Sequence, residues 1–258
     1  MMTENLDQQP LITHLIELRQ RLIYCLIGFF LAFGVSYYFA QDVFVILVRP
    51  LAAIFGPDSG RRLIYTGLTE AFMTYIKIAM FSGAFISFPI IAIQVWKFIA
   101  PGLYANEKRA FLPFLIATPI LFFAGAAFAY FFIIPNAWQF FVGFETPALD
   151  GGLPIQLEAR VNEYLSITIQ LLLAFGISFL LPIALILLAR VGIVSVSSLR
   201  NKRKYAFLAI LIVSAFITPP DVISMIGLAI PLYLLYEISI FFAVRDGKKV
   251  IIEETLNV

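Results

Sequence analysis

Six long apolar runs limit what this chain of 258 residues can fold into. They cover residues 22–40, 71–100, 111–134, 164–189, 205–217 and 222–244. A hydrocarbon core roughly 30 Å thick is crossed by about 20 helical residues, and five of the runs approach or exceed that length. The runs are apolar around the whole helical circumference and do not alternate with period two, which favours helices over a β-barrel. The sequence therefore predicts an all-α integral membrane protein.

Composition supports the same class, because 61% of the residues are hydrophobic and only 13% are charged, far from the values of a soluble domain. Lys77 lies inside the second run and Glu237 inside the sixth. The first, third, fourth and fifth runs hold no charged residue. We therefore expect six transmembrane helices in one polytopic membrane domain that covers residues 1–258.

The positive charges indicate how these helices are oriented. Thirteen lysines and arginines fall on the side of the two termini, and four fall on the opposite side: Arg49, Arg61, Arg62 and Arg160. The positive-inside rule then places both termini in the cytoplasm. The predicted organisation is a cytoplasmic amphipathic N-terminus (1–21), a six-span core (22–244) and a cytoplasmic tail (245–258). The acidic start of the chain predicts no removable signal peptide.

Two outer connections are long. Residues 42–55 form an apolar piece that is too short to cross a bilayer, and it contains Arg49 and Pro50. We expect a helix at the outer surface that is broken at Pro50. Residues 135–163 are rich in proline, glycine and acidic residues, which predicts a mostly irregular cap.

The fifth run has only 13 residues, or roughly 20 Å of helix. Pro219 and Pro220 should end this helix, and Asp221 can cap the next one. Such a hairpin must thin the bilayer, dip below its surface or be shielded by other helices, and we favour local thinning. Prolines inside other runs predict bent helices around a concave face: Pro89, Pro113, Pro119, Pro182 and Pro231.

Two charged motifs lie at the predicted cytoplasmic surface. In HLIELRQRL, residues 14–22, the side chains of His14, Glu17 and Arg21 share one helical face. This segment can be a simple interfacial anchor with a Glu17–Arg21 pair. In FIAPGLYANEKR, residues 98–109, Tyr104 can lie at headgroup depth and Glu107 precedes two cations. Taken alone, the second motif is most often a solvated loop.

Together with three further motifs, these segments resemble the TatC family, the multispan receptors of the twin-arginine protein translocase. The motifs occur in order from about residue 14 to residue 242: HLIELRQRL, the outer Arg49-Pro50, QVWKFIAPGLYANEKR from Gln94, FGISF from Phe175 and TPPDVIS from Thr218. The resemblance implies six spans in a curved bundle with both termini inside. It also implies a bacterial inner-membrane receptor that binds twin-arginine signal peptides. Folded proteins would be exported with the proton-motive force, together with TatA- and TatB-type single-span subunits and further copies of the chain.

The resemblance also implies site residues. Signal-peptide contacts would fall on Glu17, Arg19, Phe98 and Glu107, and Pro50 and Asp221 would be functionally sensitive. We add Tyr104 and Glu237, the latter as a polar contact to a partner helix or as a snorkelling group. One departure is the stretch Phe179-Leu180-Leu181-Pro182, where many members of the family carry a glutamate or glutamine. Its absence weakens a proton-relay role for this span.

Other classes fit the residues less well. A proton-coupled transporter of a small solute would use Glu237 and Lys77 as its ionisable groups in the membrane. An enzyme is not expected, because His14 is the only histidine and lies outside the spans. The single cysteine, Cys25, supports neither a disulfide nor a cysteine metal site. We predict no catalytic residues, metal, cofactor or nucleic-acid partner.

Overall fold

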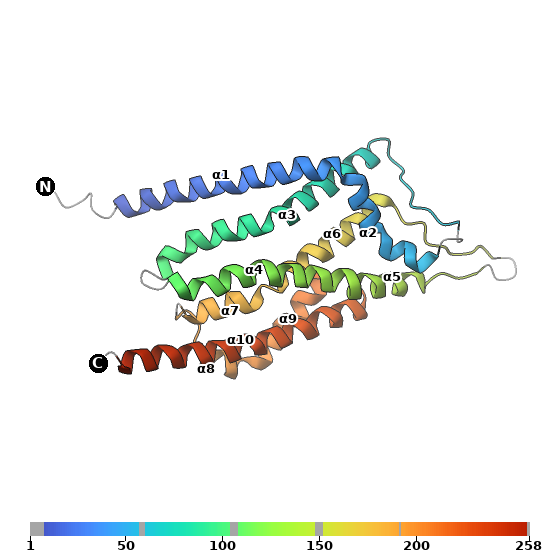
Figure 1. Ribbon diagram of the computed structural model, residues 1–258. Coiled ribbons are helices and arrows are strands. Elements are labelled where there is room, and N and C mark those ends of the chain that lie inside the picture. Colours follow the sequence, from blue (N-terminus) through green and yellow to red (C-terminus); the bar gives the residue numbers. More distant parts are fainter. Residues whose placement is uncertain (1–7, 57–59, 104–107, 148–151, 191, 257–258) are drawn as a thin grey trace. The chain divides into compact units, whose positions relative to one another are not determined.

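The computed structural model of this chain describes residues 8–56, 60–103, 108–147, 152–190 and 192–256 (Figure 1). These residues are almost entirely helical, as predicted. The elements in chain order are α1 (Gln8–Tyr38), α2 (Ala40–Phe55), α3 (Glu70–Leu103), α4 (Lys108–Phe128), the π-helix η1 (Ala129–Ile133), α5 (Ile134–Val142), α6 (Val161–Ser178), α7 (Leu181–Arg190), α8 (Val196–Asn201), α9 (Arg203–Ile217) and α10 (Val222–Leu256). Within the described ranges, β-structure is limited to two isolated bridges, Ile64–Arg160 and Thr146–Ile155.

Five helical stretches of the described chain are long and apolar enough to cross a membrane. They are Ile12–Tyr38, Glu70–Phe98, Leu112–Val142, Val161–Arg190 and Val222–Val244. The fifth predicted run corresponds to α9, which has 15 residues and is about 22 Å long. The chain is therefore an all-helical membrane protein with five long apolar helices in its described part.

One expectation about the long connections is wrong, and another holds only in part. The helix α2 is not broken at Pro50 but continues through it to Phe55. The connection after the third run begins with a helix, since α5 extends to Val142, and its described residues between Val142 and Val161 are irregular, as predicted for most of this segment. The apolar residues of this segment, including buried Ala137 and Trp138, continue the helical burial pattern past Pro135. Pro135 is the second residue of α5 and follows directly on the π-helix η1.

The described residues group into two compact units. The first contains Met1–Phe44 and Phe72–Pro119, and the second contains Val45–Ala71 and Ile120–Val258. In the first unit, α1 runs antiparallel to α3 (Figure 1). A Cβ atom on Gly83 would lie 2.8 Å from the Cα atom of Phe33, so the two backbones nearly touch. The buried Trp96 of α3 donates to the Thr118 hydroxyl of α4 at 2.6 Å.

In the second unit, α10 packs against α7 and α9. The helices α4 and α6 cross at two glycines. A Cβ atom on Gly125 would lie 2.5 Å from the carbonyl oxygen of Phe175, and one on Gly176 would lie 2.7 Å from the ring of Phe122. Small residues allow helices to approach closely in a membrane, where packing replaces the hydrophobic driving force.

Candidate functional site

The first candidate site residue, Glu17, lies on α1 and is held by Arg21 one turn further along. The Arg21 Nε and Nη2 atoms both donate to Oε1 of Glu17, at 3.0 and 2.5 Å. The expected pair is therefore confirmed. The Glu17 side chain is 33% exposed and the Arg21 side chain is 23% exposed, so solvent can reach the pair.

The same face of α1 meets α3 at two further contacts. Arg21 Nη1 donates to the Gln94 side-chain oxygen at 3.3 Å. The His14 ring stacks on the Phe98 ring, with centroids 4.3 Å apart and planes 23° apart. The carboxylate of Glu17 and the ring of Phe98 are thereby brought to one α1–α3 face. This site, called the α1–α3 site below, consists of His14, Glu17, Arg21, Gln94 and Phe98.

The other predicted signal-peptide residues are placed differently. Arg19 is exposed, and its two-residue offset from Glu17 puts it on another side of α1. Tyr104 and Glu107 lie outside the described residues. The structure thus joins Glu17 and Phe98 but not Arg19.

Pro50 is buried in the second unit, and two tyrosines explain why α2 continues through it. Proline has no N–H, so the carbonyl of Ile46 loses its regular helical donor. The hydroxyl of Tyr130, from η1, donates to that carbonyl at 2.7 Å. The hydroxyl of Tyr164, from α6, donates to the next carbonyl, that of Leu47, at 2.8 Å. Side chains from two other helices therefore donate hydrogen bonds to the two α2 carbonyls beside Pro50.

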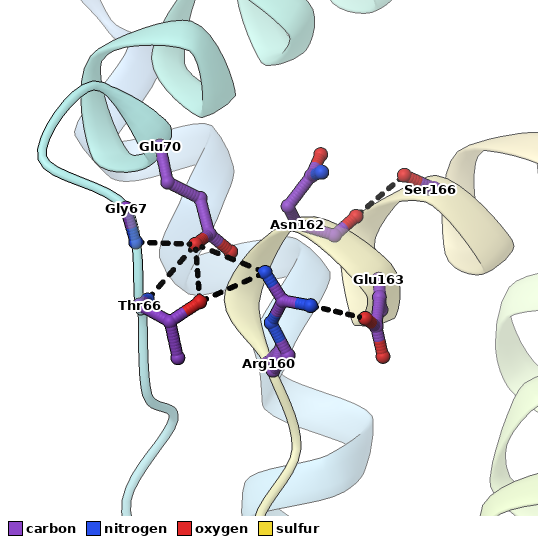
Figure 2. Close-up of polar contacts among 7 residues, drawn as sticks. All are labelled: Thr66, Gly67, Glu70, Arg160, Asn162, Glu163 and Ser166. Atoms are coloured by element: carbon purple, nitrogen blue, oxygen red, sulfur yellow. Dashed lines mark hydrogen bonds and ion pairs between the residues drawn. The ribbon is translucent and has the colours of Figure 1, made fainter.

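Hydrogen bonds and ion pairs connect the segments at the starts of α3 and α6 (Figure 2). Oε2 of Glu70 accepts from the backbone N–H groups of Thr66 and Gly67 at 2.9 and 3.1 Å. The Arg160 guanidinium donates to the Thr66 hydroxyl at 2.9 Å and lies 3.4 Å from Glu70. It also donates to Glu163 at 2.9 Å. The segment before α3 is thus fixed to the N-terminus of α6.

A second tie joins Arg61 to Glu145. Both terminal nitrogens of the guanidinium donate to the two carboxylate oxygens at 2.6 Å. The Leu157 N–H donates to the same carboxylate at 2.9 Å. The hydrogen bond from Arg61 and then that from Leu157 hold the pKa of Glu145 below its ordinary value. The bidentate geometry is the strongest form of this ion pair.

At the start of α10, Asp221 is buried and caps the helix. Its Oδ2 accepts from the Ser224 N–H at 2.6 Å, as the prediction of a cap requires. Near the other end of the hairpin, Glu237 forms an ion pair with Arg203 of α9 at 2.7 Å and accepts from Tyr233 at 3.3 Å. Its partner is therefore a neighbouring helix of the same chain. In the part of the chain that the structure describes, no group of three or more His, Cys, Asp or Glu side chains could hold a metal ion.

Several of these residues were not found from the sequence. Tyr130 and Tyr164 lie 84 and 117 positions from the carbonyls they satisfy, and no local spacing indicates such pairs. Gln94 and His14 stand inside two of the sequence motifs, but only the antiparallel packing of α1 and α3 brings Gln94 to Arg21 and His14 to Phe98. The motifs therefore marked the correct segments without giving the contacts.

A family model described as Sec-independent protein translocase protein (TatC) matches residues 13–231. A Sec-independent protein translocase protein TatC from Magnetococcus marinus is 45% identical over 241 residues, covering 92% of this chain and 86% of that protein. The TatC protein of Escherichia coli K12 is 42% identical over 237 residues, covering 92% and 89%. A crystal structure of the twin arginine translocase receptor TatC matches with a TM-score of 0.75 and 40% identity, covering 89% of this chain and 99% of that one.

The fold and these matches define a multispan, non-enzymatic component of a protein-transport machinery. The chain belongs to the TatC family of Sec-independent protein translocase proteins. It is thus a component of the twin-arginine translocase, which exports proteins independently of Sec.

Proposed function

We propose that this chain is the receptor that captures twin-arginine signal peptides for the translocase. The observation that carries the proposal is the α1–α3 site, where the Glu17 carboxylate, one-third exposed, lies on the same face as the Phe98 ring. The related crystal structure is that of a translocase receptor. A carboxylate and an aromatic ring are suitable partners for a guanidinium group.

The chemistry favours arginine over lysine. A guanidinium presents a planar fork that a carboxylate can accept through two parallel hydrogen bonds, whereas an ammonium is a compact point charge. Glu107 would supply a second carboxylate, and Arg19 and Tyr104 would line the approach. Each exposed ion pair contributes about 1 kcal/mol or less, so binding should be salt-sensitive. Apolar contacts of the signal peptide must supply the rest.

We further infer six spans in the bacterial inner membrane, with both termini in the cytoplasm. The 13-to-4 distribution of lysine and arginine supports this orientation, and it puts Glu17 on the side where a newly made signal peptide is presented. In this arrangement α9 is the short fifth span, and local thinning of the bilayer compensates for its length. Residues 1–258 form one membrane domain in this proposal.

Transport requires further subunits. A folded protein of 100 residues has a radius of gyration of about 13 Å, whereas packed helices lie about 8–10 Å apart. Six helices cannot enclose such a passage. TatA- and TatB-type single-span subunits and further copies of this chain would complete the path, driven by the proton-motive force. Pro50, Asp221 and Glu237 would support these assemblies.

Site-specific photo-crosslinking tests the receptor proposal. Probes at Phe98 and beside Glu107 should label a twin-arginine signal peptide and should label a twin-lysine peptide much less. The Glu107→Ala variant should lose the labelling, and a probe at Tyr65 in the outer connection should give none. Equal labelling by both peptides, unchanged by Glu107→Ala, would instead favour a proton-coupled transporter that uses Lys77 and Glu237.

A further inference from the structure

The Glu17 carboxylate already holds a guanidinium from its own chain. Arg21 directs two donors, Nε and Nη2, at a single oxygen, Oε1. Within the described part of the chain, Oε2 accepts no hydrogen bond. An incoming guanidinium needs both oxygens for a bidentate contact. It can therefore reach its best geometry only if Arg21 releases Oε1.

The structure offers Arg21 a second acceptor. Its Nη1 already lies 3.3 Å from Oε1 of Gln94, across on α3. A small rotation of the guanidinium towards Gln94 would keep Arg21 hydrogen-bonded while Glu17 is freed. The Arg21 side chain is 23% exposed, and the amide oxygen of Gln94 compensates for its lost contact with Glu17.

We propose that Arg21 is an internal competitor for Glu17 and that it sets the preference of the site for arginine over lysine. This inference rests on the receptor function proposed above. A signal-peptide arginine replaces Arg21 with an equivalent fork, whereas a lysine offers one compact charge and cannot replace both hydrogen bonds. The competition weakens all binding at Glu17 but weakens lysine binding more. Arg21 is therefore a specificity-determining residue, and Gln94 is a positioning residue that acts through it.

The test measures the Kd of fluorescent twin-arginine and twin-lysine signal peptides for the full chain in lipid nanodiscs. Arg21→Gln should tighten twin-arginine binding about fivefold, since one competing, partly exposed ion pair is removed. Twin-lysine binding should tighten more, so the ratio of the two Kd values should fall. Gln94→Leu should weaken twin-arginine binding about twofold to threefold, because the displaced Arg21 loses its acceptor. Arg62→Gln, which removes a cation from the outer connection, should change neither Kd.

The outcomes separate this inference from the receptor proposal. If the unmodified chain binds both peptides equally, the receptor proposal fails, and the inference fails with it. If the unmodified chain prefers arginine but Arg21→Gln leaves both Kd values unchanged or weakens them, then Arg21 only positions Glu17. In that case the receptor proposal stands and the competitor inference is overturned. Thermal unfolding of each variant identifies any loss of affinity that comes from misfolding, and Arg21→Lys, which keeps the charge without the fork, should act in the direction of Arg21→Gln.

Discussion

A single proline in α2 depends on a hydroxyl from another helix. The Tyr130 hydroxyl occupies the place of the N–H that Pro50 lacks. We expect Tyr130→Phe to reduce stability by about 1 kcal/mol, because the Ile46 carbonyl loses its donor. That loss corresponds to a decrease of about 2–4 °C in the thermal midpoint for a chain of this size. Thermal unfolding in detergent measures it, with Tyr38→Phe at an 82% exposed tyrosine as the matched control.

Combining this change with Pro50→Ala tests whether the two residues act as a pair. Alanine restores a backbone N–H to the Ile46 carbonyl, so Tyr130→Phe should then have a much smaller effect. If the two substitutions are additive instead, the hydroxyl stabilises the protein for a reason unrelated to the proline. Export of a folded reporter protein by the unmodified chain, the two single variants and the double variant would show whether this contact matters for transport.

At the scale of elements, the α4–α6 crossing depends on glycine. A Cβ atom at position 125 would overlap the Phe175 carbonyl oxygen and the Phe179 side chain. Gly125→Ala should therefore destabilise the protein by about 1–3 kcal/mol through overpacking. Gly34 in α1 is the matched control, since a Cβ atom there meets nothing within 4 Å. Gly34→Ala should be neutral or stabilise by up to about 1 kcal/mol, because alanine is the better helix former.

Thermal midpoints of the two alanine variants decide this point. If Gly125→Ala is as stable as Gly34→Ala, the crossing can separate without loss, and the close approach of α4 and α6 is not required. An additional Gly176→Ala variant probes the reciprocal contact with Phe122, and its effect should not add fully to that of Gly125→Ala because the two contacts share one interface.

The sequence predicted the elements better than the contacts between them. Apolar runs located all of the long helices because a membrane span needs a minimum length of apolar residues. Spacing also predicted the Glu17–Arg21 pair and the Asp221 cap, which are local interactions. The prediction that the helix breaks at Pro50 is wrong, since the continuity of α2 depends on a tyrosine 84 residues away from the carbonyl it contacts. It likewise missed α8 and the π-helix, which no simple periodicity marks.

For the whole molecule, the connections that precede α3 and α6 in the second unit are held by ion pairs as well as by the backbone bridges Ile64–Arg160 and Thr146–Ile155. Arg61 pairs with Glu145, and Arg160 contacts Glu70, Thr66 and Glu163. The Arg61 guanidinium also lies over the Phe55 ring, 4.6 Å from its centroid. Such contacts depend on the ionisation of the carboxylates. The order of this region should therefore depend on pH, while the apolar contacts between the spans should not.

Glu145 gives this pH dependence a direction. Its pKa in the folded protein is lowered by the Arg61 hydrogen bond, so the stabilisation is fully present above the unfolded-state pKa of about 4.3 and is lost as the pH falls through the folded-state value. Hydrogen exchange at the Leu157 N–H, which donates to Glu145, should stay slow at neutral pH and lose its protection as the pH falls through the lowered pKa of Glu145. In Glu145→Gln this protection should be weaker at neutral pH and nearly independent of pH.

Glu158→Gln, a neutralised exposed carboxylate in the same connection, should behave like the unmodified chain. Unchanged protection in Glu145→Gln would mean that the backbone contacts hold the region without the Arg61–Glu145 pair.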